Sequence, residues 1–146
     1  MDVKIRQAKD EDANVVLSMV KALKTDDVSS RKNAWEKAFP RLVSSPDHLI
    51  VVAKIDGKIV GYVSATKILT FEVSRPFLMI DMLWVEPEHR YRGVGKALVS
   101  DCVDFAQREG CIQVAVISRE EAKGFYEKLG MSEGRFTVFV KELHIT

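Results

Sequence analysis

The sequence predicts one α/β domain over residues 1–146, in which a mixed sheet carries helices on both faces. Two β-rich runs flank Asp56 and Gly57, the pair that a tight type I′ hairpin turn prefers. A strand, a helix and a second strand follow one another between residues 76 and 117, which implies a right-handed parallel crossover. The predicted order is β-α-α-β-β-β-α-β-α-β, so antiparallel and parallel pairing share one sheet.

The first third of the chain predicts one strand and two helices. Residues 3–8 alternate between polar and apolar side chains, as a strand does. A helix is expected over residues 9–23, with Asp10 as its N-cap and further acids in its first turn. Pro40 predicts a kink or an early end in the second helix. That helix is indicated by apolar residues at helical spacing: Trp35, Phe39, Leu42 and Val43.

The middle of the chain predicts the hairpin over residues 48–68 and then a central strand over residues 76–87. Apolar residues run almost without interruption along this second segment, which indicates burial on both faces. A helix over residues 93–110 follows, with Gly110 as its stop. Its apolar face comprises Val94, Ala97, Leu98, Cys102 and Phe105.

The last third predicts a buried strand over residues 111–117 and a helix over residues 118–130. Ser118 and Glu121 stand in capping-box positions, and Gly130 is the expected end of the helix. A final strand is expected over residues 135–143.

Composition excludes several classes of protein. Hydrophobic residues make up 47% of the chain, and the formal net charge is +1. This near balance argues against a nucleic-acid coat or a polybasic membrane binder. The N-terminus lacks the apolar core of a signal peptide, and no apolar run approaches the ~20 residues that span a bilayer. Cys102 and Cys111 form no CxxC and predict free thiols in a reducing, cytoplasmic compartment.

The run VEPEHRYRGVGKALV places two glycines at the start of a predicted helix, and three phosphate-binding interpretations compete for it. A P-loop would need glycine at Arg90 and a hydroxyl at Ala97, after Lys96, to bind Mg²⁺. A dinucleotide loop would need a third glycine at Leu98. Both patterns are incomplete, and the scattered histidines, His48, His89 and His144, predict no metal site.

The third interpretation is a pyrophosphate cradle that uses no metal. Amides of residues 92–96 at a helix N-terminus form an anion nest, which the helix dipole strengthens. Gly93 and Gly95 remove Cβ atoms where the backbone would approach phosphate oxygens. Arg90 and Arg92 add charge and planar donors. The alternative is a glycine-containing loop with solvated arginines, and spacing alone does not decide between the two.

Two segments resemble the GNAT N-acetyltransferase superfamily. Arg90-x-x-Gly93-x-Gly95 resembles its Q/R-x-x-G-x-G/A motif, and the residues 120–131, EEAKGFYEKLGM, resemble its A-x-x-F/L-Y-E-K-L-G-F stretch. Arg119 stands where many members carry asparagine, so the contacts of that asparagine are not carried over. The resemblance implies a mostly antiparallel sheet of six to seven strands and about four helices. A parallel, splayed pair of strands would bind coenzyme A.

The resemblance also implies a set of cofactor-binding residues for acetyl-CoA. Members of the family bind it in a V-shaped gap, here between the strand ending at Val85 and the strand of residues 111–117. Backbone of Leu83 and Val85 would bind pantetheine, and an N–H near Leu83 would polarise the thioester carbonyl. The full implied set is Leu83, Trp84, Val85, Arg90, Tyr91, Arg92, Gly93, Val94, Gly95, Lys96 and Phe125.

The implied reaction is direct attack of a primary amine on the thioester in a ternary complex. Asp81 is the expected general base, with a structural aspartate as the alternative. Glu86 is a second candidate, although it also suits a solvated turn. Tyr126 matches the general acid of the family, with core packing of the last helix as the alternative.

The acceptor amine, a small molecule or a peptide, is poorly specified. The first two helices shape the acceptor pocket in the family, and here they bring Asp26, Asp27 and Trp35. The two acids could attract a cationic amine and Trp35 could stack on it. Alternatively, the acids form a solvated loop and Trp35 belongs to the apolar face of the helix. A non-catalytic acyl-CoA-binding module of the same fold is the alternative function. Dimers are common among relatives, so the resemblance also allows a homodimer. Neither nucleic acid nor a membrane is an expected partner.

Overall fold

The computed structural model describes residues 2–23, 32–71, 74–135 and 137–143. Its sheet has five strands in the order β1-β2-β3-β4-β5, with four antiparallel strands and one parallel pair, β4–β5. The mixed α/β class is therefore confirmed, but the described residues form fewer strands than the six to seven expected. The strands are β1 (Lys4–Gln7), β2 (His48–Ile55), β3 (Lys58–Leu69), β4 (Pro76–Val85) and β5 (Val114–Val116).

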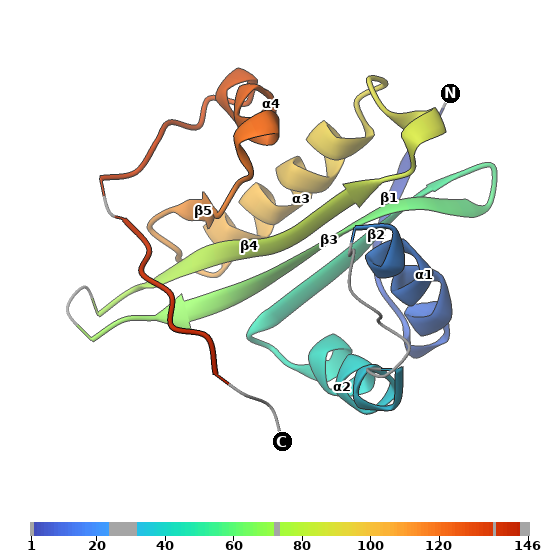
Figure 1. Cartoon of the computed structure of the whole chain (residues 1–146), viewed down its shortest axis with the longest axis horizontal. Coiled ribbons are helices and arrows are strands. Elements are labelled where there is room, and N and C mark those ends of the chain that lie inside the picture. Colours follow the sequence, from blue (N-terminus) through green and yellow to red (C-terminus); the bar gives the residue numbers. More distant parts are fainter. Residues whose placement is uncertain (1, 24–31, 72–73, 136, 144–146) are drawn as a thin grey trace.

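Helices cover both faces of this sheet, as the sequence predicts (Figure 1). The helices α1 and α2 lie together on one side, and α3 and α4 lie on the other. A short 3-10 turn lies before each of α1, α3 and α4. The bounds are α1 (Ala13–Leu23), α2 (Lys32–Ser44), α3 (Val94–Arg108) and α4 (Lys123–Lys128), with the 3-10 turns η1 (Asp10–Asp12), η3 (Pro87–His89) and η4 (Glu120–Ala122).

Two hydrophobic cores result, one on each face of the sheet. The core under α3 includes Leu98 and Cys102, both fully buried, and the central-strand residues Leu78 and Ile80. The core under α1 and α2 includes Phe39, which is also fully buried. Alternating side chains of β2, β3 and β4 supply both cores, because successive residues of a strand point to opposite faces.

The hairpin between β2 and β3 turns where the sequence predicts. Asp56 has a φ of 52° and Gly57 a φ of 78°, so both central residues of the turn are left-handed. A two-residue turn of type I′ requires this conformation, which explains the Asp-Gly pair. The prediction of an antiparallel hairpin is confirmed.

A β-bulge interrupts the pairing of β3 with β4. Ser64 pairs with Met82 and Ala65 pairs with Ile80, so Asp81 is an extra residue without a partner in β3. The bulge displaces Asp81 from the alternation of β4, and its side chain is exposed. The burial on both faces that is expected along residues 76–87 therefore fails at Asp81, although β4 does lie in the interior of the sheet.

Three expectations about helix ends are wrong. Asp12 rather than Asp10 caps the first turn, because its carboxylate accepts the backbone N–H of Lys9 at 2.8 Å. Pro40 does not end α2 early, because the helix continues to residue 44 with Phe39 buried in the core, and the alternative of a kink stays a prediction. Ser118 forms no capping box, since its hydroxyl donates to the carbonyl of Arg119 and the helical turn begins one residue later.

The C-terminal part departs furthest from the prediction. The strand β5 covers residues 114–116 only, and the helical segment is split into η4 and α4. No strand forms in the described residues of the expected final strand, 135 and 137–143. A strand requires a neighbour with which to share backbone hydrogen bonds, and this segment pairs with no strand of the described sheet.

Candidate active site

The central feature of the site is the point where β4 and β5 part. Parallel pairing joins residues 78–80 of β4 to residues 114–116 of β5 and then ends at Ile80. The strand β4 continues to Val85, and among the described strands none pairs with residues 81–85 on the β5 side. A stretch of strand edge with unshared backbone groups therefore faces the space between the two strands.

Tyr126 lies on the α3 side of this opening. It packs against the α3-side core together with Leu83 and Val85 of β4 and Val116 of β5, all of them half-buried. Phe125 and Tyr126 meet edge to face, with ring centroids 5.0 Å apart. The structure thus brings Leu83, Val85 and Tyr126, three of the residues that the sequence singles out, to one face of the sheet.

Burial raises the pKa of Tyr126, and the neighbouring Cys102 adds to the effect. A phenol whose pKa lies above its usual ~10 keeps its proton at neutral pH. Cys102 lies in the same core, where burial raises the pKa of its thiol to about 12. Tyr126 can therefore donate a proton at neutral pH, whereas the buried thiol of Cys102 is not a nucleophile.

The loop before α3 presents backbone amides. Gly93 is the N-cap of α3 with a φ of 84°, and no side chain caps the helix. The N–H of Ala97 makes a bond of 3.0 Å to the carbonyl of Gly93, so the amides of Val94, Gly95 and Lys96 precede the intrahelical ladder. These amides point outward from a helix N-terminus, which is a favourable position for an anion.

Tyr91 shows that this loop is held in an unusual conformation. Its φ is 63°, a left-handed value that residues other than glycine rarely adopt, and its side chain is fully exposed. No core contact of the side chain accounts for this geometry. Left-handed residues at positions 91 and 93 curl the backbone at the helix start, in the manner of an anion-binding nest.

Arg90 joins the loop to the end of β4. Its Nε donates to the carbonyl of Val85 at 2.8 Å, and its guanidinium lies 4.5 Å from the centroid of the Trp84 ring. Trp84 in turn packs against the core under α1 and α2, on the opposite face from Tyr126. Arg90 therefore makes intramolecular contacts. Arg92, which also takes part in an interaction of its own, and Lys96 have exposed side chains beside the helix start.

Gly95 has a packing role that the sequence does not reveal. A Cβ atom at this position would lie 3.1 Å from Cζ of Phe125 and 3.9 Å from a methyl group of Val85. The absent side chain therefore leaves room for the Phe125 ring between α3 and α4. Gly93, in contrast, has open space around it and is needed for its positive φ.

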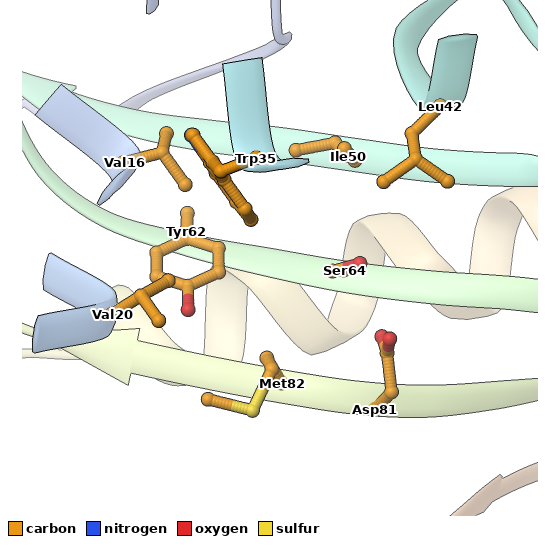
Figure 2. A pocket seen from close by; sticks show the side chains of 9 residues that line it. All are labelled: Val16, Val20, Trp35, Leu42, Ile50, Tyr62, Ser64, Asp81 and Met82. Atoms are coloured by element: carbon orange, nitrogen blue, oxygen red, sulfur yellow. The ribbon is translucent and has the colours of Figure 1, made fainter. Parts of the chain in front are cut away.

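A cavity of about 180 Å³ lies on the other face of the sheet, between the strands and the helices α1 and α2 (Figure 2). Asp81 and Ser64 lie at one end of it, and the Asp81 carboxylate points toward Ser64. Tyr62 lies toward the other end. The rest of its lining is apolar: Val16, Val20, Trp35, Leu42, Ile50 and Met82.

Tyr62 adds a buried hydroxyl group to the lining of this cavity. The alternation of side chains along the strand does not identify this hydroxyl as part of a site. Its side chain is 2% exposed, and its hydroxyl has no hydrogen-bond partner among the described residues. Burial raises its pKa, with a smaller contribution from the charge of Asp81. Its presence in the same cavity as Asp81 depends on the β3–β4 register, which the sequence does not specify.

The structure therefore separates the two candidate catalytic residues. Asp81 lines the cavity under α1 and α2, whereas Tyr126 packs on the α3 side of the sheet. Trp35 lines the cavity, and its indole N–H donates to the carbonyl of Ala13 at 3.2 Å. Asp26 and Asp27 lie outside the described residues, and Glu86 lies in the turn after β4, half-buried.

Residues 2–23, 32–71, 74–135 and 137–143 contain no group of three or more His, Cys, Asp or Glu side chains able to hold a metal ion. None of the helices in this part of the chain combines the length and apolarity that a bilayer crossing requires. Both cysteines are free thiols.

Comparison with known proteins agrees with the fold. The model of the acetyltransferase (GNAT) family matches residues 16–131, which is most of the chain. The protein therefore belongs to the GNAT family of acetyltransferases, and the resemblance seen in its two motifs is confirmed.

Individual relatives are similar over parts of the chain. A glucosamine 6-phosphate N-acetyltransferase of Trypanosoma brucei brucei is 41% identical over 51 residues, 35% of each chain. An uncharacterized N-acetyltransferase of Methanocaldococcus jannaschii is 29% identical over 108 residues, 70% of this chain and 48% of the relative. The chain spans less than half the length of the curated relatives it matches.

Solved structures are similar over nearly the whole chain. The glucosamine-6-phosphate N-acetyltransferase of Arabidopsis thaliana superposes with a TM-score of 0.83 at 25% identity, over 97% of this chain and 99% of the other. An acetyltransferase of Trypanosoma brucei gives a TM-score of 0.78 at 26% identity, over 97% of this chain and all of the other. The arrangement of strands and helices is thus that of the family.

Proposed function

We propose that this protein is an acetyl-CoA-dependent N-acetyltransferase that transfers the acetyl group to a primary amine by direct attack in a ternary complex. The observation that carries this proposal is the parting of β4 from β5 at Ile80, with β4 continuing to Val85, close to Gly95 in the first turn of α3. An open strand edge therefore leads toward a set of helix-start amides. A thioester whose long pantetheine arm is joined to a pyrophosphate would use both.

The residues present fit coenzyme A. Amides of residues 92–96 would bind the pyrophosphate, with Arg92 and Lys96 supplying charge, and the backbone of Leu83 and Val85 would bind pantetheine. Among the other implied cofactor residues, Arg90 and Trp84 would hold the loop in place. Phe125 would form a wall of the gap. Val94 would contribute only its backbone, since its side chain is buried, and Tyr91 would also contribute its backbone. Bound acetyl-CoA supplies the activated acetyl group.

Asp81 would prepare the amine. An alkylamine has a pKa near ~10.4, so about one molecule in a thousand is neutral at pH 7. Asp81 sits at the bulge where β4 leaves β5, and its exposed carboxylate can take a proton directly or through water. In the described chain no side chain is seen to hydrogen-bond this carboxylate or pair with it, which leaves it available as a base.

Tyr126 would protonate the leaving thiolate from the opposite face. Its raised pKa keeps the phenol protonated at neutral pH, and a thiolate of pKa about 8.5 is a suitable acceptor. The separation of Asp81 from Tyr126 suits a reaction in which one residue accepts a proton and the other donates one. The amine loses its proton on the α1/α2 side, and the thiolate gains one on the α3 side.

The lining of the cavity favours an acceptor with an apolar body. Six of its nine residues are apolar, and its described lining includes no lysine or arginine. The curated relative of Trypanosoma brucei brucei is named for glucosamine 6-phosphate, whose phosphate would need cationic partners. We therefore propose an arylalkylamine or alkylamine without a phosphate. The hydroxyl of Tyr62, which has no hydrogen-bond partner among the described residues, and the carboxylate of Asp81 would accept hydrogen bonds from its ammonium group.

The experiment is a thiol-release assay with acetyl-CoA over a panel of amines, with N-acetylated product identified by mass spectrometry. The panel contains phenethylamine, butylamine, spermidine, glucosamine 6-phosphate and a lysine-containing peptide. Turnover is expected with the first two and little with the amino sugar phosphate. Binding of acetyl-CoA without turnover of any amine would instead favour a non-catalytic acyl-CoA-binding module.

A further inference from the structure

Ser64 is a polar residue of the cavity to which the proposed function gives no role. It lies in β3 opposite the bulge, where its partner in the register is Met82. Ile80 and Leu83 of β4 pack on the α3 side of the sheet, whereas Asp81 and Met82, which lie between them, both line the cavity. Two consecutive side chains of β4 therefore face the single side chain of Ser64, as a bulge of one residue requires.

The polar groups of Ser64 and Asp81 lie at the same end of the cavity without being bonded to each other. The carboxylate of Asp81 points toward Ser64 (Figure 2). Over the residues that the structure describes, neither side chain makes a hydrogen bond or an ion pair, with the other or with a third group. The cavity, of about 180 Å³, has room for water. A water between the two groups could bond to both, and it would satisfy both.

We propose that Ser64 is a positioning residue that acts through Asp81: the Ser64 hydroxyl and the Asp81 carboxylate hold one water, which passes the proton of the acceptor amine to Asp81. This inference rests on the proposed function and adds a residue to it. The water donates one hydrogen bond to the carboxylate and one to the Ser64 oxygen. Its own oxygen then remains free to accept a hydrogen bond from the ammonium group.

The proton transfer balances without any further reactant. One N–H bond of the ammonium group breaks, and its proton forms a new O–H bond on the water. The water gives up another proton to a carboxylate oxygen of Asp81, so the water is restored and Ser64 keeps its own proton. The electron pair of the broken N–H bond stays on nitrogen, where it is available to attack the thioester.

The first test is the rate at which Ser64→Ala acetylates phenethylamine. At pH 7 kcat should fall about 10-fold, the rate equivalent of one hydrogen bond, while the KM for the amine changes little. The loss should shrink as pH rises, because free amine becomes abundant and needs no proton acceptor. Ser64→Thr keeps the hydroxyl and should restore most of the rate. Ser100→Ala, an exposed change on α3, is the matched control.

A role that acts through Asp81 also predicts how the two changes combine. Asparagine at position 81 cannot take the proton, so adding Ser64→Ala to Asp81→Asn should cause no further loss of kcat. A serine with a structural role alone would lower kcat by the same factor in both backgrounds. The double-mutant cycle therefore separates positioning from packing.

A crystal structure of the wild-type protein should show a water within hydrogen-bond distance of Ser64 Oγ and of an Asp81 carboxylate oxygen, and Ser64→Ala should lack it. Circular dichroism should show that this variant folds as the wild type does. An active wild type whose Ser64→Ala variant keeps its kcat and pH profile, or whose two changes are additive, would overturn the role of Ser64 alone. A wild type that acetylates no amine of the panel would overturn the proposed function and this role with it.

Discussion

At the scale of single residues, the bulge at Asp81 decides the chemistry of the candidate site. An acid within an apolar run suggests a buried charge, and the sequence does not reveal the extra residue in β4 that leaves Asp81 exposed at one end of the cavity. The bulge interrupts the pairing of β3 with β4 at the point where β5 leaves β4. The carboxylate of Asp81 therefore lies on β4 where the gap begins.

The role of Asp81 is tested by Asp81→Asn. We expect turnover at pH 7 to fall by on the order of 10²–10³-fold, because the amide cannot accept a proton from the amine. The loss should shrink as pH rises, since free amine becomes more abundant. The pH dependence of kcat measures this, with Asp104→Asn, an exposed change on α3, as the control. An unchanged profile would make Asp81 structural.

Tyr126→Phe tests the opposite face. The ring keeps its edge-to-face contact with Phe125, so the fold and acetyl-CoA affinity should be nearly unchanged. Without the phenolic proton, kcat should fall by roughly 10²-fold or more. Steady-state kinetics that show an equal loss in kcat and kcat/KM are expected. A wild-type kcat would leave Tyr126 as a packing residue only.

At the scale of elements, the start of α3 depends on how α4 packs against it. The motif predicts glycine at position 95 for close approach to phosphate, yet the nearest neighbour of an added Cβ is the Phe125 ring. The spacing of the two motifs along the chain could not reveal this contact, because it depends on how the two helices cross. Position 95 therefore links the cradle to the helix that carries Tyr126.

Gly95→Ala should destabilise the protein by about 1–2 kcal/mol, because a Cβ at 3.1 Å forces the Phe125 ring to move. Phe125→Leu in the same chain should relieve part of this cost. Urea denaturation of the two single variants and the double variant gives a double-mutant cycle. Additive effects would mean that the two residues do not meet.

The turn between β1 and α1 is held by an ion pair. Asp12 accepts from Arg6 at 2.7 and 3.1 Å and is 4% exposed. The hydrogen bond from Arg6 lowers the pKa of Asp12, so its stabilisation is present above the unfolded-state value of ~3.9 and is lost as pH falls through the lower, folded-state pKa.

Asp12→Asn should therefore cost on the order of 2 kcal/mol at pH 7, the usual range for hydrogen bonds to charged groups. The difference from wild type should hold down to about pH 5 and shrink below about pH 4. Chemical denaturation at several pH values checks this. A difference that grows as pH falls would contradict the assigned pKa direction.

At the scale of the whole molecule, patterns that repeat locally were predictable and long-range register was not. The Asp-Gly turn, the apolar face of α3 and the crossover from β4 to β5 are all encoded within short windows, and all three form. Strand register, which brings Tyr62 and Asp81 to one cavity, depends on contacts between distant segments. The failure of the expected last strand has the same cause, since a strand is completed only by a partner.

Both faces of the sheet are needed for the proposed reaction. A cavity with a carboxylate lies on one face, a protonated phenol lies on the other, and the parted strands connect them.

The most direct test of this account is a crystal structure of the protein with coenzyme A. We predict pyrophosphate oxygens within hydrogen-bond distance of the amides of residues 92–96. The pantetheine should lie along β4 between Met82 and Val85, with its sulfur between Asp81 and Tyr126. Coenzyme A bound elsewhere, or a pyrophosphate held away from the start of α3, would contradict the central claim.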